Sequence, residues 1–480
     1  MRERTSAQWT LSPAMLIGLI IASLSGFADA NEAEIVAPAF GRPAIVAPGE
    51  SFNIDVVTDG AAPTAVELVS SRHQDHRYTL AVSHGPAAST GSGGAIENGG
   101  MHRLRAKVET SVPEGQYDLV VSGGEQSATR AHCVSVRRLG ARLRVVVIGS
   151  IGVGEPCVPR FDSRLVNDIN LRGPQVVVLL GGYVGSKAAN ATVEWERLRS
   201  ELRRIDAAVV AACGAADPLE DFSREFGPSP IGAITIGPHR VIVAYDPPAD
   251  ALSQNSAQRE WLRGALTAEA GSADGALLLV GPRAESSDFV RSLVGASPTT
   301  PRGAAEGAVA AQSVADGKPV AGLLTWVIAD TPAVAAPSLA PAPRLALVRS
   351  IPAMPGCGPL DSAGFSILDF GPSSAGEWRA DLTQAQVGEL AIDYEMANDG
   401  TVVQLPTRLI NRTDRVIDGA VFRARVSKAS AGTRPWAVGG RLIGLADHHE
   451  FWEATVSADV PAHGAIRVVV GSGERPAANP

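Results

Sequence analysis

Apolar and polar residues follow one pattern in the middle of this chain and another towards its two ends. In the middle, continuous apolar runs end in glycine, as in RLRVVVIG and PQVVVLLGG, and segments with helical spacing of apolar residues lie between them. Strands that are apolar on both faces are typical of buried parallel sheets. We therefore expect residues 140–335 to form an α/β domain, a layered sheet with flanking helices.

The flanking regions predict all-β domains instead. Short segments with alternating apolar and polar residues, such as SFNIDVV and HRLRAKV, are separated by turn residues. Residues 31–139 are expected to form an immunoglobulin- or fibronectin-like β-sandwich, and residues 336–480 a second β-sandwich. A stretch rich in alanine and proline, at about residues 297–343, is typical of a linker.

The first 30 residues have the pattern of a signal peptide. Arg2 and Arg4 precede the apolar segment Ala14–Phe27, and Ala28-Asp29-Ala30 matches a small-x-small cleavage site. The apolar run is shorter than the roughly 20 residues that a membrane-spanning helix needs, and no second segment of that length follows. The mature protein is expected to be exported, periplasmic or extracellular, with no transmembrane segment after cleavage.

Charge and cysteine content narrow the possible partners and chemistry. The net charge is −8 and no cluster of five or more basic residues is present, which argues against nucleic acid as a partner. An exported protein can form disulfides, and a Cys157–Cys213 bridge is one hypothesis for the four cysteines. Buried free thiols that pack as small apolar residues are the other.

Two groups of histidines raise the question of a metal site. His73, His76 and His84 lie close together in the chain, but no further ligands follow them in a recognisable spacing. His448 and His449 precede Glu450, but neighbours on an extended strand point to opposite faces. We expect solvated histidines in the first group and no metal site in the second.

The loops that follow the central apolar runs lack the residues that an active site would need there. In α/β sheets the loops after the carboxyl ends of the strands build the site. Here these loops hold small residues where an enzyme usually has aspartate, histidine and asparagine. Those positions are Ser150, Gly152, Gly182, Ala215 and Ala216.

The order and spacing of these segments resemble the motifs of the calcineurin-like metallophosphoesterases, including the purple acid phosphatase branch. VVVIGSIGVG aligns with the family's Asp-x-His, LLGGYV with Gly-Asp, and GAAD with Gly-Asn-His-Asp or Glu; ALLLVGP aligns with a strand that ends in a histidine before proline. The likeness covers roughly residues 105–285, and the family's last motif, Gly-His-x-His, has no match. The positions that match family ligands are Ser150, Gly152, Gly182, Ala215, Ala216 and Gly281 (or Val280).

The resemblance implies a metallophosphoesterase-like central domain that has lost its metal ligands. Members of the family hold two divalent ions that polarise the phosphoryl oxygen and generate a hydroxide nucleophile. Glycine and alanine side chains offer no donor atoms. The expected protein is therefore a pseudo-enzyme without catalytic residues or a cofactor. It would act as a binding or structural protein of the cell envelope, with a protein or polysaccharide as its partner.

Two alternatives remain open at this stage. One is an active phosphoesterase with an altered, single-metal site for an ion such as Mn, Fe or Zn. Asp217 is its residual candidate, and the other acids in reach are Glu155, Asp162, Asp168 and Asp246. The other alternative is a noncatalytic receptor for phosphate-bearing ligands, because glycine-rich strand ends can present backbone N–H groups to an anion.

Overall fold

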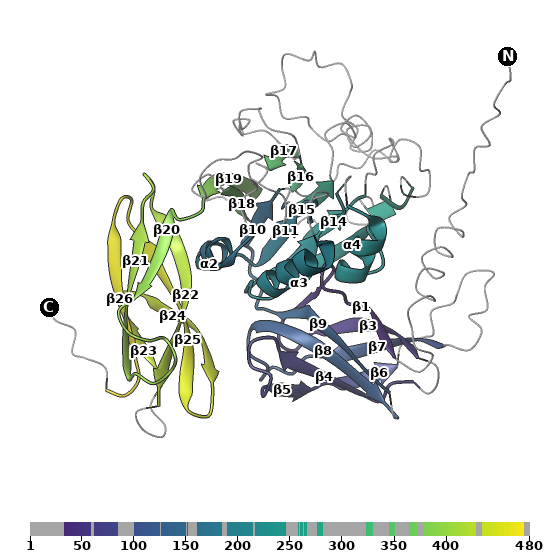
Figure 1. The fold of residues 1–480 in the computed structure, drawn as a ribbon, viewed down its shortest axis with the longest axis horizontal. Helices are drawn as coiled ribbons and strands as arrows, with labels where there is room; N and C mark the ends of the chain where they lie inside the picture. The colour runs from purple at the N-terminus through teal and green to yellow at the C-terminus, as the bar shows by residue number, and fades with distance from the viewer. Residues whose placement is uncertain are drawn as a thin grey trace, which may run out of the picture.

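The structure is a computed structural model of the whole chain and comprises two β-sandwiches and a central block of two sheets with helices (Figure 1). The described residues are 33–58, 62–84, 100–124, 126–149, 151, 161–184, 190–214, 217–245, 258, 260–262, 264–265, 276–281, 323–329, 345–350, 364–372, 378–428 and 434–474. For 276–281, 323–329, 345–350, 372 and 378–380 only the backbone is described. The proposed signal peptide lies outside these residues.

The N-terminal sandwich consists of two sheets that share one core. The first has the order β1 (Glu34–Ala37), β3 (Ser51–Thr58), β7 (Gly100–Lys107), β6 (Ala81–His84). The second has the order β2 (Ala44–Val46), β9 (Gln126–Val136), β8 (Gly115–Gly123), β4 (Ala65–Ser70), β5 (Arg77–Thr79). The alternation in β3 buries Phe52, Ile54 and Val56, and their neighbours face outward.

The first sheet of the central block is built on three parallel strands. Its order is β12 (Ala208–Ala211), β11 (Val176–Leu179), β10 (Leu143–Ile148), β18 (Gly364–Pro372), β19 (Trp378–Gln386), of which the last two are antiparallel to their neighbours. The three parallel strands are buried on both faces, as their continuous apolar sequence predicts. One face carries α2 (Ser163–Leu171), α3 (Ala191–Leu202) and α4 (Leu219–Phe226).

The second sheet of the block packs against the other face of the first. Its order is β13 (Gly232–Ile236), β14 (His239–Val243), β15 (Ala276–Gly281), β16 (Leu323–Ala329), β17 (Leu345–Ser350). The first two strands form an antiparallel hairpin, and the strands from β14 to β17 run parallel. Val145 and Val178 of the first sheet share a core with Ile236 and Val241 of the second.

The C-terminal sandwich begins later than the sequence suggests. The sequence pattern predicts a start at residue 336, but β17 extends the second central sheet and β18 pairs with β10 in the first. The sequence GFSILDFG fits an internal strand of a mixed sheet, which β18 is, as well as a sandwich strand, so it does not reveal the pairing. The central block therefore continues to Gln386.

The strands after Gln386 form two antiparallel sheets. One has the order β20 (Leu390–Tyr394), β21 (Gln404–Asn411), β26 (Ala465–Gly471), β23 (Trp436–Val438). The other has the order β22 (Ile417–Ser427), β25 (Phe451–Val460), β24 (Arg441–Asp447). Among the described residues, no helix has the length and apolar character that crossing a membrane requires.

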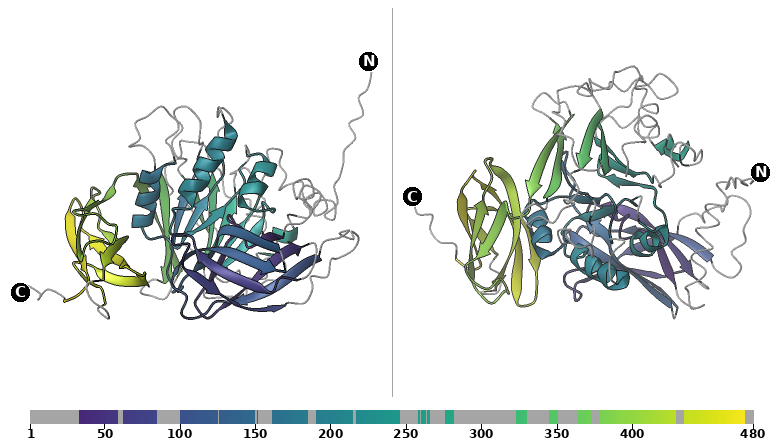
Figure 2. Two further views of the ribbon diagram at one scale, coloured as in Figure 1. Left: turned by 60° about the horizontal axis from the view of Figure 1, so that its bottom comes forward. Right: turned by 45° about the horizontal axis from the view of Figure 1, so that its top comes forward.

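Both sandwiches contact the central block, which Figures 1 and 2 show with the N-terminal sandwich in purple and blue and the C-terminal one in yellow. Helix α2 lies beside the C-terminal sandwich, and its Leu171 is part of that sandwich's core. On the other side, Phe40 from the N-terminal segment packs in the core beneath the helices. Arg42 donates hydrogen bonds to the carbonyl oxygens of Ala211 and Pro230.

Candidate functional site

The ends of the central parallel strands are held together by one carboxylate, that of Asp217. Asp217 Oδ2 accepts hydrogen bonds from the backbone N–H groups of Gly182 (2.8 Å) and Gly214 (2.7 Å), and its Oδ1 accepts one from Tyr183 (2.9 Å). The side chain is buried. Burial raises the pKa of Asp217, and the three N–H donors oppose that shift. The carboxylate thus links the loops that follow β11 and β12.

The two loops approach each other so closely that their contact requires glycine. A Cβ placed on Gly181, whose φ is +94°, would lie 2.4 Å from the Cα of Gly214. Below them, Tyr183 is fully buried against Phe226 and donates its hydroxyl proton to the carbonyl oxygen of Ala212 at 2.7 Å. The region under these loops is therefore filled by backbone and aromatic rings.

Other positions singled out from the sequence have structural roles or lie outside the described residues. Asp162 caps α2 by accepting from the N–H groups of Arg164 and Leu165, and Asp168 pairs with Arg172 and accepts from the N–H of Gly388. Burial raises the pKa of Asp168 to about 6. Gly281 ends β15, where only the backbone is described. Ser150, Gly152, Glu155, Ala215, Ala216 and Asp246 lie outside the described residues.

The cysteines that the structure describes are buried free thiols. They are Cys133 and Cys213, and burial raises the pKa of each to about 12. Cys157 and Cys357 lie outside the described residues. Cys213 therefore behaves here as a small apolar residue of the core beneath the helices.

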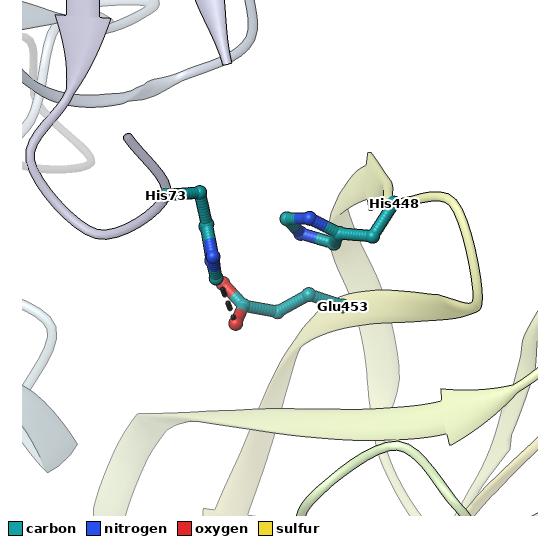
Figure 3. Close-up of side chains that lie close together, drawn as sticks. All are labelled: His73, His448 and Glu453. Carbon is teal, nitrogen blue, oxygen red and sulfur yellow. Dashed lines mark ion pairs between the residues drawn. The ribbon is translucent and has the colours of Figure 1, made fainter. Parts of the chain in front are cut away.

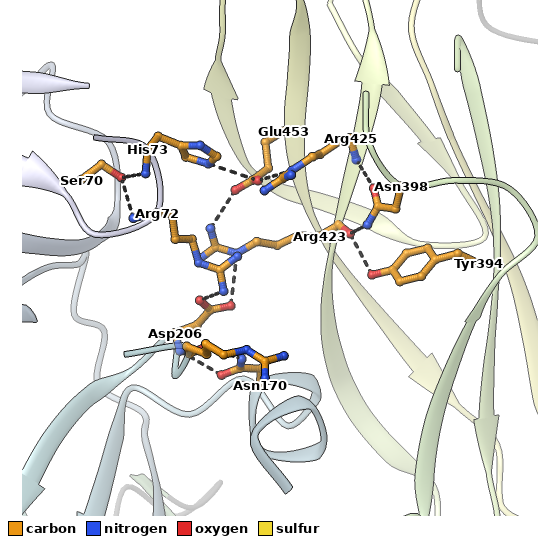
Figure 4. A network of polar contacts seen from close by, with 11 residues as sticks. Ser70, Arg72, His73, Asn170, Asp206, Tyr394, Asn398, Arg423, Arg425 and Glu453 are labelled. Carbon is orange, nitrogen blue, oxygen red and sulfur yellow. Dashed lines mark hydrogen bonds and ion pairs between the residues drawn. The ribbon is translucent and has the colours of Figure 1, made fainter. Parts of the chain in front are cut away.

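A second group of polar side chains, not foreseen from the sequence, lies where the three parts of the chain meet (Figure 4). Asp206, which precedes β12, pairs with Arg72 of the N-terminal sandwich and, at 3.2 Å, with Arg423 of the C-terminal sandwich. Arg423 also reaches Glu453 at 2.8 Å. We call Arg72, Asp206, Arg423, Arg425 and Glu453 the junction network.

Glu453 is the buried member of the junction network, with 3% of its side chain exposed, whereas the other four side chains are 23–34% exposed. Burial alone would raise the pKa of Glu453, but the contact with His73 and the charges of Arg423 and Arg72 outweigh it and lower that pKa. Arg425 binds the same carboxylate at 3.0 Å from the neighbouring strand. The sequence signal was FRARV in β22, where alternation places two arginines on one face of a strand whose other face is apolar.

The structure brings two histidines of the first group, His73 and His76, together with His448 of the second. His73 lies between β4 and β5, and His448 lies in the turn between β24 and β25; their ring centroids are 4.1 Å apart. His76 stacks on His448 at 4.4 Å. His84 and His449 are exposed.

A cleft of about 1430 Å³ opens beside the junction network and is lined by all three parts of the chain. Its wall carries many charges, and some are internally paired, as Arg144 is with Asp369 at 2.6 Å. Within the described part of the chain, Arg142 and Arg441 have no carboxylate partner, and their side chains are exposed. The arginines of the wall are Arg137, Arg138, Arg142, Arg144, Arg423, Arg434 and Arg441, and its acids are Glu114, Asp206, Asp369, Asp381, Asp418, Glu453 and Asp459.

Comparisons with known proteins assign no family. No family model matches the chain, and no curated protein matches it. Among solved structures, a Bacteroides fragilis protein assigned as an alpha-galactosidase/melibiase is 9% identical, with a TM-score of 0.20, over 92% of this chain and 98% of that one. The amylomaltase of Corynebacterium glutamicum is 14% identical, with a TM-score of 0.16, over 30% of this chain and 21% of its own length. Likenesses at these TM-scores carry no argument about fold or activity.

Proposed function

We propose that this chain is an exported, catalytically inactive relative of the calcineurin-like metallophosphoesterases, and that it serves as a binding or structural protein of the cell envelope. The central block supports the proposal by its two packed sheets and helix layer, together with the order of the sequence motifs. The observation that carries it is the bonding of Asp217. This carboxylate, the residual acid of the motif GAAD, is engaged by three backbone N–H donors.

The bonding of Asp217 argues against a single-metal site at the strand ends. Oδ2 already accepts two N–H bonds, so an ion at that oxygen would have to displace one of them, which costs about 1–3 kcal/mol when the donor has no other acceptor. Gly182, the described position that matches a family ligand in the same loops, offers no donor atom from its side chain. A metal ion that generates hydroxide would therefore find few ligands at the ends of these strands.

The arginine-lined cleft is the surface on which we expect the partner to bind. Guanidinium groups recognise carboxylates in bidentate geometry, and Arg142 and Arg441 are exposed without a carboxylate partner in the described part of the chain. The wall also carries seven carboxylates, so we expect Arg142 and Arg441, and not the wall as a whole, to bind acidic groups of a protein or polysaccharide.

The function is tested with purified full-length protein and phosphomonoester and phosphodiester substrates in the presence of Mn, Fe or Zn. We expect no turnover above that of a mock purification. Turnover above that level would overturn the proposal, and its loss in Asp217→Asn would place the active site at the strand ends. Binding to acidic polysaccharides is measured in parallel, and R142A/R441A should bind at least tenfold more weakly than the wild type.

A further inference from the structure

His73, His448 and Glu453 form a compact group between the two sandwiches (Figure 3). One ligand atom from each of the three lies within 4.8 Å of the others. The Nε2 atom of His73 lies 3.4 Å from Oε2 of Glu453. The group combines one residue from the N-terminal sandwich with two from the C-terminal sandwich, so neither sandwich holds it alone.

The two imidazoles carry nitrogen atoms that are buried but make no hydrogen bond. The Nε2 atoms of His73 and His448 both belong to this class, and His448 is only 5% exposed. A buried polar atom without a partner costs free energy, so native proteins rarely leave one without a reason. Nε2 of His448 has no hydrogen bond, and Nε2 of His73 has only the 3.4 Å contact with Glu453, so a bound ion shared by the three residues would satisfy both nitrogen atoms.

The donor set fits a transition-metal ion of the zinc class. Neutral imidazole nitrogens together with a carboxylate oxygen suit zinc and its neighbours, whereas calcium and magnesium prefer oxygen donors throughout. Zinc bonds of about 2.0–2.2 Å place tetrahedral ligands roughly 3.3–3.5 Å apart. Movements of about 1 Å by the ligand atoms, which lie within 4.8 Å of one another, would bring their separations into that range. A water molecule can complete the coordination.

The two arginines beside Glu453 determine which of its carboxylate oxygens can coordinate an ion. Arg423 binds Oε1, and Arg425 binds Oε2, the oxygen that faces His73. Each carboxylate oxygen has two lone-pair sites, so Oε2 can accept from Arg425 and still coordinate an ion. Hydrogen bonds of this kind also orient a metal ligand. The guanidinium charges weaken cation binding, which leaves the two imidazoles as the main source of affinity.

We propose that His73, His448 and Glu453 bind one zinc-class ion that fastens the N-terminal sandwich to the C-terminal sandwich. The role is structural, because the ion would join two domains through side chains from both. The site is remote from the strand ends that Asp217 holds together, and it does not depend on the proposed function.

The test uses full-length protein without an affinity tag, treated with a chelator and then titrated with Zn(II) at pH 7.5 in a calorimeter. We expect one Zn(II) per chain and a rise in the thermal unfolding midpoint on binding. His448→Ala and His73→Gln should each weaken Zn(II) binding at least tenfold and abolish the thermal shift. His449→Ala is the matched control, because this neighbouring histidine is exposed, and it should bind as the wild type does.

Two further measurements keep the outcome unambiguous. Far-UV circular dichroism of the zinc-free variants establishes that they are folded, and His73→Gln serves as the milder variant because His73 is only half-buried, whereas His448 is buried. Asp217→Asn should bind Zn(II) as the wild type does, which separates this site from one at the strand ends. Absence of Zn(II) binding, or binding that His73→Gln and His448→Ala leave unchanged, would overturn the proposal.

Discussion

At the scale of single residues, the carboxylate of Asp217 shows how an acid in a motif can be structural. It ends the motif GAAD and is directed at three backbone N–H groups of two loops that approach each other closely. The close contact between Gly181 and Gly214 brings these donors together. A carboxylate in this environment organises the backbone, and its charge is balanced by the N–H dipoles.

Replacing Asp217 with alanine should destabilise the protein by at least about 3 kcal/mol. The substitution leaves three N–H donors without their acceptor, and each unsatisfied buried donor costs about 1–3 kcal/mol. Urea denaturation followed by circular dichroism measures the loss. Asp221→Ala is the control, because its carboxylate pairs on the surface with Arg224 and should cost under about 1 kcal/mol. Equal losses in the two variants would contradict this role for Asp217.

His132 should make stability depend on pH between about 4 and 6.5. Burial of this side chain in the N-terminal sandwich lowers its pKa from 6.5 to about 4, so in that range the unfolded chain binds a proton that the native protein does not. Stability is therefore complete above pH 6.5 and falls as the pH drops towards 4, by about 3 kcal/mol from this residue.

His132→Asn removes the titrating ring at a position whose φ of 53° suits asparagine. The difference in unfolding free energy between pH 7 and pH 4.5 should become smaller in this variant than in the wild type. His463→Asn is the matched control, since His463 also has a positive φ (47°) but is exposed. A wild-type pH dependence that persists in His132→Asn would show that other groups cause it.

At the scale of elements, the sequence was informative wherever burial sets the pattern. The runs that became β10, β11 and β12 are apolar on both faces, and the structure buries every residue in them except Arg144. Pairing was less predictable, because β18 joins β10 across more than 200 residues of sequence. The sequence of β18 does not show which strand it pairs with, so the boundary of the C-terminal sandwich was placed too early.

The segment around Gly41 should tolerate no side chain, because it joins the N-terminal sandwich to the central block. A Cβ on Gly41 would lie 2.7 Å from the Cβ of Phe226 and 2.9 Å from the Cβ of Ala211. Gly41→Ala is therefore expected to destabilise the protein by about 1–3 kcal/mol through forced displacement of the backbone. Thermal and urea unfolding measure the effect.

Gly140→Ala is the matched control for Gly41→Ala. The nearest atom to a Cβ at position 140 lies 4.0 Å away, and the residue's φ is not positive, so the added methyl group meets open space. We expect a change within about 0.5 kcal/mol there. Similar stabilities for the two variants would mean that residues 39–42 can move away from α4 without cost.

At the scale of the whole molecule, the parts of the chain meet through side chains that are far apart in sequence. Arg72, Asp206 and Arg423 come from three regions, and no local pattern connects them. His73 and His448 likewise come from distant parts of the sequence. From the residues around each, we expected His73 to be solvated and His448 to bind no metal. A local sequence pattern describes each of these side chains separately, whereas the packing of the domains brings them into contact.

Asp206 should be the residue on which the arrangement of the two sandwiches depends most. Its carboxylate lies between Arg72 and Arg423, so Asp206→Ala leaves two guanidinium groups close together with Glu453 as the nearest remaining counter-charge. Because these side chains are mostly shielded from solvent, screening by salt relieves their repulsion only in part. We expect the C-terminal sandwich to separate from the rest of the chain.

Small-angle X-ray scattering of Asp206→Ala should therefore give a larger radius of gyration than that of the wild type. Limited proteolysis should cut faster near Gly388, where α2 contacts the turn between β19 and β20. Asp414→Ala is the control, because this exposed acid pairs only with its neighbour Arg415 and should leave both measurements unchanged. An unchanged radius of gyration in Asp206→Ala would mean that the packing of Leu171 and the pairing of Arg172 with Glu389 suffice to hold the C-terminal sandwich in place.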